Sequence, residues 1–306
     1  MVALALTLVV GARAVAAQGG ETAAIVLEQP AGARALALGG ALVAAPDHDA
    51  SLFSNPAFLH GAGTSASLSG QRFIAASTLG AASAAATAFG GTLAIGIRAL
   101  DYGSEDEFVP DTARFGGQRG MATGGTVSAS EAALSVGYAR RSGRLRVGLA
   151  AGLTYLQIAN ESGTAPSVDL GAAVDLPRGI IAGAVVQNVG TELTLASTAS
   201  PLPRVLRAGV SVPLELGPVN ALVLGEAGLS SSDEVVPRAG LELSWRSVNG
   251  ITVSGRAGTR GGELAGIGRT TFGGGIAASR VSLEYAYQSL ETLGGSAHRI
   301  GLRYRR

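Results

Sequence analysis

The amino-acid sequence predicts an all-β protein, a transmembrane antiparallel β-barrel of about 14 strands with a short N-terminal luminal plug segment. Three observations lead to this prediction. Hydrophobic residues make up 47% of the 306-residue chain and charged residues only 15%, whereas soluble domains carry about 25% charged residues. Short segments after residue 63 alternate between apolar and small or polar residues. Segment 32–59, just before them, does not follow this alternation.

The alternation is clearest in residues 144–157. One face carries Leu145, Val147, Leu149, Ala151, Leu153 and Tyr155, and the other carries Arg146, Gly148, Ala150, Gly152 and Thr154. Several apolar faces end in an aromatic residue, namely Tyr138, Tyr155, Trp245, Tyr285, Tyr287 and Tyr304. A lipid-facing band with an aromatic border is typical of membrane barrels, whereas a β-sandwich would carry more aromatic residues inside and more charge outside.

Turn signals divide the rest of the chain into strands. We predict strands at residues 64–72, 76–88, 91–102, 130–140, 144–158, 167–176, 180–189, 204–215, 219–229, 236–246, 250–260, 265–278, 280–289 and 297–305. Tight turns such as Gly90-Gly91 and Asn249-Gly250 join several of them. Connections 103–129 and 190–203 are long and polar, and we expect the first to be an extracellular loop.

Segment 75–97 leaves an alternative open, because it has no charged residue and is long enough to cross a membrane as a helix. Gly80, Gly90, Gly91 and Gly96 favour two strands joined by a Gly-Gly hairpin instead. No second uncharged stretch of this kind follows. The hairpin is therefore the preferred interpretation.

Isolated charges lie on the polar faces of the alternating segments. They are Arg207, Glu242, Arg256, Arg269, Glu284 and Arg303. A charge that faces lipid costs several kcal/mol, whereas one that faces a wet or ion-paired lumen costs little. We therefore expect these six side chains to point into the lumen.

The first residues resemble a signal peptide. The apolar run 2–10 is too short for a membrane-spanning helix, and the small residues of a cleavage site follow it at Ala14-Val15-Ala16 or Val15-Ala16-Ala17. We expect residues 1–17 to be a cleaved signal peptide, residues 18–63 a linker and plug segment, and residues 64–306 the barrel. The chain has no cysteine, which suits passage through an oxidising periplasm. The expected location is the bacterial outer membrane, with membrane lipid as a partner.

The sequence shows no catalytic or cofactor-binding pattern. A net charge of +1 does not indicate nucleic-acid binding. Asp47-His48-Asp49 could suggest a metal site, but His60 and His298 offer no second cluster with ligand spacing, so a solvated loop is the simpler explanation. No hydrolase, zinc-protease or kinase signature occurs. We expect no metal, no cofactor and no enzymatic activity.

Segment 32–59 carries a recognisable motif. Its stretches Ala33–Ala41, Val43-Ala44, Asp49-Ala50-Ser51 and Asn55-Pro56-Ala57-Phe58-Leu59 resemble the N-terminal signature of the PorV/PorQ family, which is related to the FadL-type outer-membrane barrels. Later matches follow in order at residues 100–103, 125–130, 187–190, 201–203, 284–287 and 298–300. Within the motif, the residues assigned to the plug are Arg34, Gly39, Gly40, Asp49, Asn55, Pro56 and Ala57.

The resemblance implies a 14-stranded barrel with its N-terminal segment folded in the lumen. FadL-like barrels import hydrophobic small molecules, often through a side opening, whereas PorV-like barrels receive secreted protein cargo in type IX secretion. The sequence does not choose between the two. A secreted structural or adhesin-like β protein without transport activity is a further alternative.

The plug motif also predicts contacts. The expected luminal partners of Arg34 and Asp49 are Glu242, Glu284 and Arg256. Gly39 and Gly40 would allow close packing against the wall, and Asn55-Pro56 would turn the chain into the first strand. A role as structural filler is as compatible with this segment as a gating role.

Overall fold

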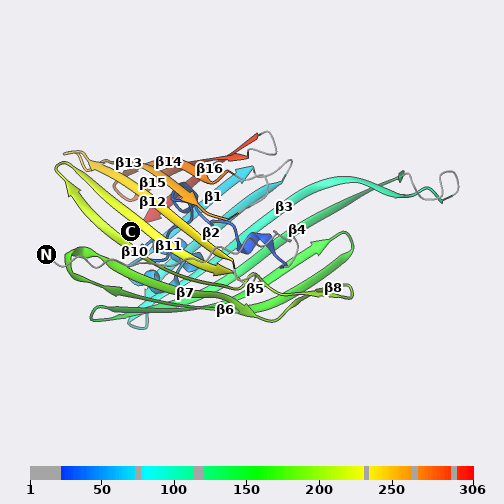
Figure 1. The fold of residues 1–306 in the computed structure, drawn as a ribbon, viewed down its shortest axis with the longest axis horizontal. Helices are drawn as coiled ribbons and strands as arrows, with labels where there is room; N and C mark the ends of the chain where they lie inside the picture. Colours follow the sequence, from blue (N-terminus) through cyan, green and yellow to red (C-terminus); the bar gives the residue numbers. More distant parts are fainter. Residues whose placement is uncertain (1–21, 73–76, 113–119, 231–233, 263–267, 291–294) are drawn as a thin grey trace.

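The computed structural model describes residues 22–72, 77–112, 120–230, 234–262, 268–290 and 295–306, apart from the side chain of Asp49. Fourteen strands form one closed antiparallel barrel (Figure 1). They are β1 (Ser65–Arg72), β2 (Thr78–Ala88), β3 (Gly91–Pro110), β4 (Gly120–Ser142), β5 (Leu145–Ile158), β6 (Glu161–Asp175), β7 (Ile181–Gly190), β10 (Val205–Leu216), β11 (Val219–Ser230), β12 (Val235–Arg246), β13 (Thr252–Arg260), β14 (Thr270–Ala278), β15 (Val281–Leu290) and β16 (Gly295–Arg305). The predicted fold class is confirmed.

The barrel closes between its first and last strands. β1 pairs antiparallel with β16 from Ser65 opposite Arg305 to Arg72 opposite His298. Closure leaves no open sheet edge within the ring, so the backbone polar groups of the ring find partners without water.

The wall alternates in burial as the sequence alternates in polarity. In β5, Leu149 is 50% exposed, whereas its neighbour Ala150 is 2% exposed. Large apolar side chains therefore point outward, and glycine, alanine and polar residues point inward. This arrangement is the reverse of a soluble protein and suits a barrel surrounded by lipid.

Segment 75–97 is a hairpin in its described part, as preferred above. β2 and β3 pair from Thr78 opposite Asp101 to Ala88 opposite Gly91. The helical alternative is wrong, because the frequent glycines and the pairing of small residues favour strands. Among the described residues, none of the helices is long and apolar enough to cross a membrane.

The connection predicted at 103–129 is largely strand, which corrects the sequence prediction. β3 continues to Pro110 and β4 begins at Gly120, with shifts in register after Asp101 and after Asp106. Figure 1 shows these two strands extending past the rest of the barrel. Neither face of such a ribbon is buried, so its sequence lacks the alternation that reveals a strand.

The two ends of the barrel differ. At the end where β1 starts and β16 finishes, here called the terminal end, connections contain between two and five residues. At the opposite, distal end, connections contain up to 14 residues. The longest of these holds a small hairpin of β8 (Leu193–Leu195) and β9 (Thr198–Ser200). A turn, η4 (Pro177–Gly179), lies at the terminal end.

Candidate functional site in the barrel lumen

Residues 22–63, here called the inner segment, lie inside the barrel (Figure 1). Four short helical turns make up its regular structure. They are η1 (Ile25–Leu27), α1 (Ala33–Ala37), η2 (His48–Phe53) and η3 (Pro56–Leu59). η1 contacts β3 and β4, α1 contacts β13 to β16, η2 contacts β1 to β4, and η3 contacts β3 to β6. Hydrogen bonds join the segment to the remaining strands β7, β10, β11 and β12, so the wall surrounds the segment.

Inward glycines give the inner segment its space. A Cβ at Gly148 would overlap the backbone of Pro56, one at Gly183 the carbonyl of Val43, and one at Gly258 the backbone of Leu38 and Gly39. Only a residue without a side chain allows two backbones to approach this closely. The wall sequence is therefore fitted to the segment that it encloses.

One charge cluster fixes α1 to the wall. This Arg34 network consists of Arg34, Asp47, Glu242, Arg256, Glu284 and Arg303. Arg34 Nε lies 2.8 Å from Glu242 Oε2, and Arg303 Nη2 lies 2.8 Å from Asp47 Oδ1. Arg256 Nε lies 2.5 Å from Glu242 Oε2. Three cations and three carboxylates balance formally, which a poorly hydrated site requires.

The surroundings of Arg34 keep it charged. Burial lowers the pKa of Arg34, but the carboxylates of Glu242 and Asp47 outweigh burial and raise that pKa above its ordinary value. Its Nη1 also donates to the carbonyl of Pro46 at 2.8 Å. Arg34 therefore links the helix α1, the turn before η2 and strand β12.

A second cluster, the Glu226 network, holds the middle of the inner segment. It consists of Gln187, Arg207, Glu226 and Arg238. Glu226 accepts from Val43 N–H at 2.9 Å and lies 3.3 Å from Arg207 and 3.0 Å from Arg238. Arg207 also donates to the carbonyl of Ser54 at 2.7 Å. Wall side chains thus bond to the backbone of the segment as well as to one another.

The same kind of contact recurs around the ring. Wall donors reach segment carbonyls in the pairs Arg98 with Leu27, Ser69 with Ala31, Arg299 with Pro30, and Ser211 with Ala44. In the opposite sense, Val26 N–H donates to Glu131 at 2.7 Å. An irregular buried chain has few backbone partners of its own, so these wall groups satisfy it.

Asn55 organises the last turn of the inner segment. The side chain is fully buried and caps η3 by accepting from Ala57 N–H at 3.1 Å, while its Nδ2 donates to the carbonyl of Val43 at 2.7 Å. Pro56 starts η3, because proline suits the first position of a helical turn. The chain then reaches β1 at Ser65, one residue from the predicted start of the first strand.

The remaining motif residues lie as follows. Gly39 and Gly40 have positive φ angles of 65° and 79°, and a Cβ on Gly39 would meet the backbone of Thr259 at 2.7 Å. The side chain of Asp49 lies outside the described part, and Asp47 pairs with Arg34 and Arg303. Arg269 is exposed just before β14.

Several charged residues of the lumen were not among those that the sequence was expected to place there. They are Asp47, Arg98, Glu131, Glu226, Arg238 and Arg299. Those on strands could have been found, because each lies on the inward face of a strand whose opposite face is apolar. Asp47 could not, because the irregular inner segment has no two-residue period.

A narrow cavity separates the inner segment from one part of the wall. It lies against β1, β2, β15 and β16, where its lining includes the small residues Ser67, Ser69, Ala81, Ser83 and Gly301 and, from the Arg34 network, Glu284 and Arg303. On the side of the inner segment the lining includes Ala50 and Phe53. Several of the wall side chains at this space are small.

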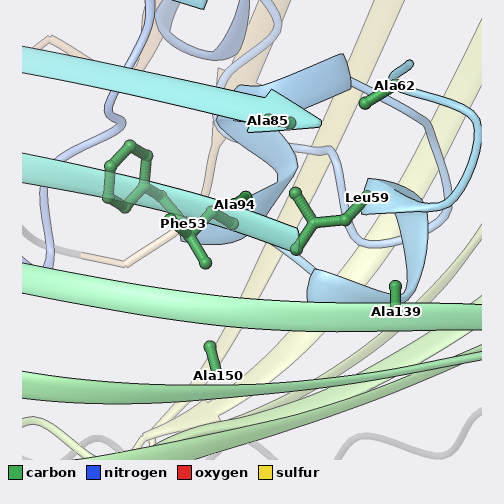
Figure 2. Close-up of a cluster of buried hydrophobic side chains, with 8 residues drawn as sticks. Phe53, Leu59, Ala62, Ala85, Ala94, Ala139 and Ala150 are labelled. Carbon is green, nitrogen blue, oxygen red and sulfur yellow. The ribbon is translucent and has the colours of Figure 1, made fainter. Parts of the chain in front are cut away.

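Phe53 belongs to a buried apolar cluster next to this cavity. Figure 2 shows Phe53 and Leu59 of the inner segment among wall alanines, with Ala85 on β2 and Ala94 on β3. The Arg98 guanidinium lies 5.0 Å from the Phe53 ring centre. A second small cavity is lined by Arg98 together with Thr154, Ser167, Asp169 and Asn188. The stacked pair of Phe53 and Arg98 therefore lies between the two cavities.

His48 is a titratable group of the inner segment next to the Arg34 network. Burial, followed by the charge of Arg303, lowers its pKa to about 4. The imidazole is therefore neutral at neutral pH. Among the described residues, no group of three His, Cys, Asp or Glu side chains is arranged to hold a metal ion.

Comparison with known proteins identifies the fold. No protein-family model matches the sequence, and no curated protein matches it. The P. putida toluene transporter TodX is similar with a TM-score of 0.58 and 14% identity over 90% of this chain and 98% of that chain. The fold is FadL-like. The Ralstonia pickettii toluene transporter TbuX is similar with the same TM-score, the same identity and the same coverage of both chains. A Pseudomonas aeruginosa FadL homologue is similar with a TM-score of 0.52 and 7% identity over 90% of this chain and 98% of that chain.

Proposed function

We propose that this FadL-like barrel is a passive transporter of small hydrophobic molecules in the bacterial outer membrane. The observation that carries the proposal is the cavity beside Phe53, in a lumen that the inner segment largely fills. Two structurally similar proteins are described as toluene transporters, which supports this substrate class.

The lining of the cavity suits an uncharged, apolar solute. The hydroxyl groups of Ser67 and Ser83 lie 2.9 Å apart and bond to each other, so little polar surface is left for the solute to desolvate. Methyl groups of Ala50 and Ala81 and the ring of Phe53 supply apolar surface. Glu284 and Arg303 also line the cavity, and they pair with each other, with 3.5 Å between Arg303 Nη1 and Glu284 Oε1. An ion would lose its hydration there and would have to compete with this existing ion pair, which is costly.

In this proposal the inner segment is a plug. Residues 1–17 act as the export signal, and the plug blocks polar solutes because its backbone is bonded to the wall on several sides. Apolar molecules would pass along the small-residue wall beside it, where the cavity lies.

Uptake by proteoliposomes tests the transport role. Purified barrel would be reconstituted into vesicles, and entry of radiolabelled toluene would be compared with that into protein-free vesicles. Ala81→Phe places a large ring in the cavity and is expected to reduce protein-dependent uptake severalfold. Ala84→Phe on the same strand is the matched control, because Ala84 is exposed on the outer face. Equal uptake by wild type, Ala81→Phe and empty vesicles would reject the transport role.

A secretion accessory role is the second candidate, favoured by the ribbon of β3 and β4 beyond the barrel and by the PorV/PorQ-like motif. Such a ribbon offers a surface for protein cargo outside the membrane. Cross-linking in cells that express the protein, followed by mass spectrometry, would test this role. Secreted proteins should dominate the products and should disappear when residues 104–127 are replaced by a short turn, while toluene uptake persists. Products unchanged by this replacement would exclude the ribbon as a cargo site.

A further inference from the structure

A polar cluster lies on the outer face of the barrel at the distal end. Along β16 the outward residues change from Leu302 and Ile300 to His298 and Ser296. The residues next to His298 in register are Tyr287 on β15 and Arg72 on β1. The outward surface thus changes from aliphatic to polar and aromatic within one or two residues of each strand.

Hydrogen bonds hold the imidazole of His298 in place. Its Nδ1 lies 2.7 Å from the hydroxyl of Tyr285, and its Nε2 lies 2.9 Å from the hydroxyl of Ser296. The ring of Tyr287 meets it edge-on with 5.5 Å between ring centres. An exposed histidine fixed on three sides is a preorganised group rather than a mobile one.

Arg72 gives this cluster a positive charge. It is exposed and faces His298 across the β1–β16 pair. Among the described residues on the outward faces of β15, β16 and β1, no side chain is acidic. The face therefore presents a guanidinium, an imidazole and hydroxyl groups, with the aliphatic band directly beside them.

We propose that this cluster binds the phosphate group of a lipid in the outer leaflet. The distal end carries the long connections, which in outer-membrane barrels lie outside the cell, so the cluster lies at the depth of outer-leaflet headgroups. Guanidinium groups bind phosphate through paired charge-assisted hydrogen bonds. The aliphatic surface beside the cluster, including Leu302 and Leu68, receives the acyl chains. This inference does not depend on the transport proposal.

Native mass spectrometry of the full-length barrel in detergent tests the lipid site. Phosphatidic acid is the probe, and diacylglycerol with the same chains is the phosphate-free comparison. Wild type is expected to retain phosphatidic acid selectively. Arg72→Gln is expected to weaken that retention about tenfold, as loss of one charge-assisted contact would, and His298→Gln less. Arg140→Gln is the matched control, because Arg140 is exposed on the outer face at the terminal end.

Each comparison decides for or against the site. Heat-modifiable migration in gels would establish that each variant is folded, and Arg72→Lys should recover part of the binding. Equal retention of both lipids, or equal retention by wild type and Arg72→Gln, would overturn the proposal and leave an ordinary interfacial belt. Full displacement of the lipid by inorganic phosphate would also overturn it, because the site would then recognise free phosphate rather than a lipid.

Discussion

The inner segment meets two different walls. On its charged flank it faces Glu242, Arg256, Glu284 and Arg303, which form the Arg34 network with Arg34 and Asp47. On its small-residue flank it faces Ser67, Ser69, Ala81 and Ser83, which line a cavity that Glu284 and Arg303 of the charged flank border. Both flanks belong to one barrel with the same alternation, so the difference lies only in the inward side chains.

The two flanks differ in how strongly they resist displacement of the inner segment. Buried ion pairs tolerate little displacement, because a carboxylate that loses its cation remains unsolvated. Small side chains beside a void lose few contacts when a neighbour moves. We therefore expect the charged flank to control barrier and stability, and the small-residue flank to control passage of apolar solutes.

The largest expected effect is on the charged flank. Arg34→Met leaves Glu242 and Asp47 short of a cation, and breaking a buried pair in this way costs about 3–5 kcal/mol. The free energy of unfolding in denaturant would be followed by the fluorescence of Trp245, the single tryptophan. Planar-bilayer recordings should show higher ion conductance, because the segment loses its anchor.

Arg246→Met controls for the loss of a surface charge. Arg246 is exposed at the end of β12, so its replacement should change stability by less than about 0.5 kcal/mol. An Arg34→Met barrel that is as stable and as impermeable to ions as Arg246→Met would contradict the assignment of the charged flank as the anchor.

A second substitution distinguishes the passage of apolar solutes from the barrier to ions. Phe53→Ala enlarges the cavity on the small-residue flank and is expected to cost about 3 kcal/mol, the lower end for a buried phenylalanine. Toluene uptake should rise while ion conductance stays low, since the Arg34 network is intact. Phe89→Ala is the matched control, because Phe89 is 86% exposed. Ion conductance that rises as much as in Arg34→Met would show that the flanks do not differ in this respect.

Lowering the pH perturbs the charged flank without a substitution. His48 lies near Asp47, Arg34, Arg303 and Arg305 and has a pKa of about 4 in the folded protein, below the ordinary value of about 6.5. The unfolded chain therefore binds the proton more readily between these values, so stability falls as pH drops from about 6.5 to 4. Below about pH 4 the contribution of His48 is fully lost.

The comparison of wild type with His48→Gln isolates this contribution, because the other titrating groups are common to both proteins. The difference in unfolding free energy between them should change over this pH range and be flat above it. A difference that does not vary with pH would contradict a depressed pKa for His48.

The architecture could be predicted because lipid on one side imposes a strict two-residue period. A strand such as β5 shows it over its full length. The outer parts of β3 and β4 could not be predicted, because the ribbon has no buried face. In such a ribbon, backbone pairing is not reflected in side-chain polarity.

The luminal charges were predictable as a set but not as partners. Inward position follows from the strand period, which is why Arg256 and Glu284 could be expected in the lumen. Which carboxylate meets Arg34 depends on how an irregular chain folds inside the ring, and Asp47 rather than Asp49 is the acid that the structure describes there. The two-residue period of the strands carries no information about how such an irregular chain folds.

The smallest effect on stability is expected on the small-residue flank. The hydroxyl groups of Ser67 and Ser83 bond to each other at 2.9 Å. Replacing both by alanine removes donor and acceptor together, so no polar group of the pair is left unsatisfied, and the cost should stay below about 1 kcal/mol. Ser67→Ala alone leaves one hydroxyl without this partner and should cost at least as much as the double change. If the double variant instead lost as much stability as Arg34→Met, the small-residue flank would be an anchor as well, and passage along it would require the whole inner segment to move.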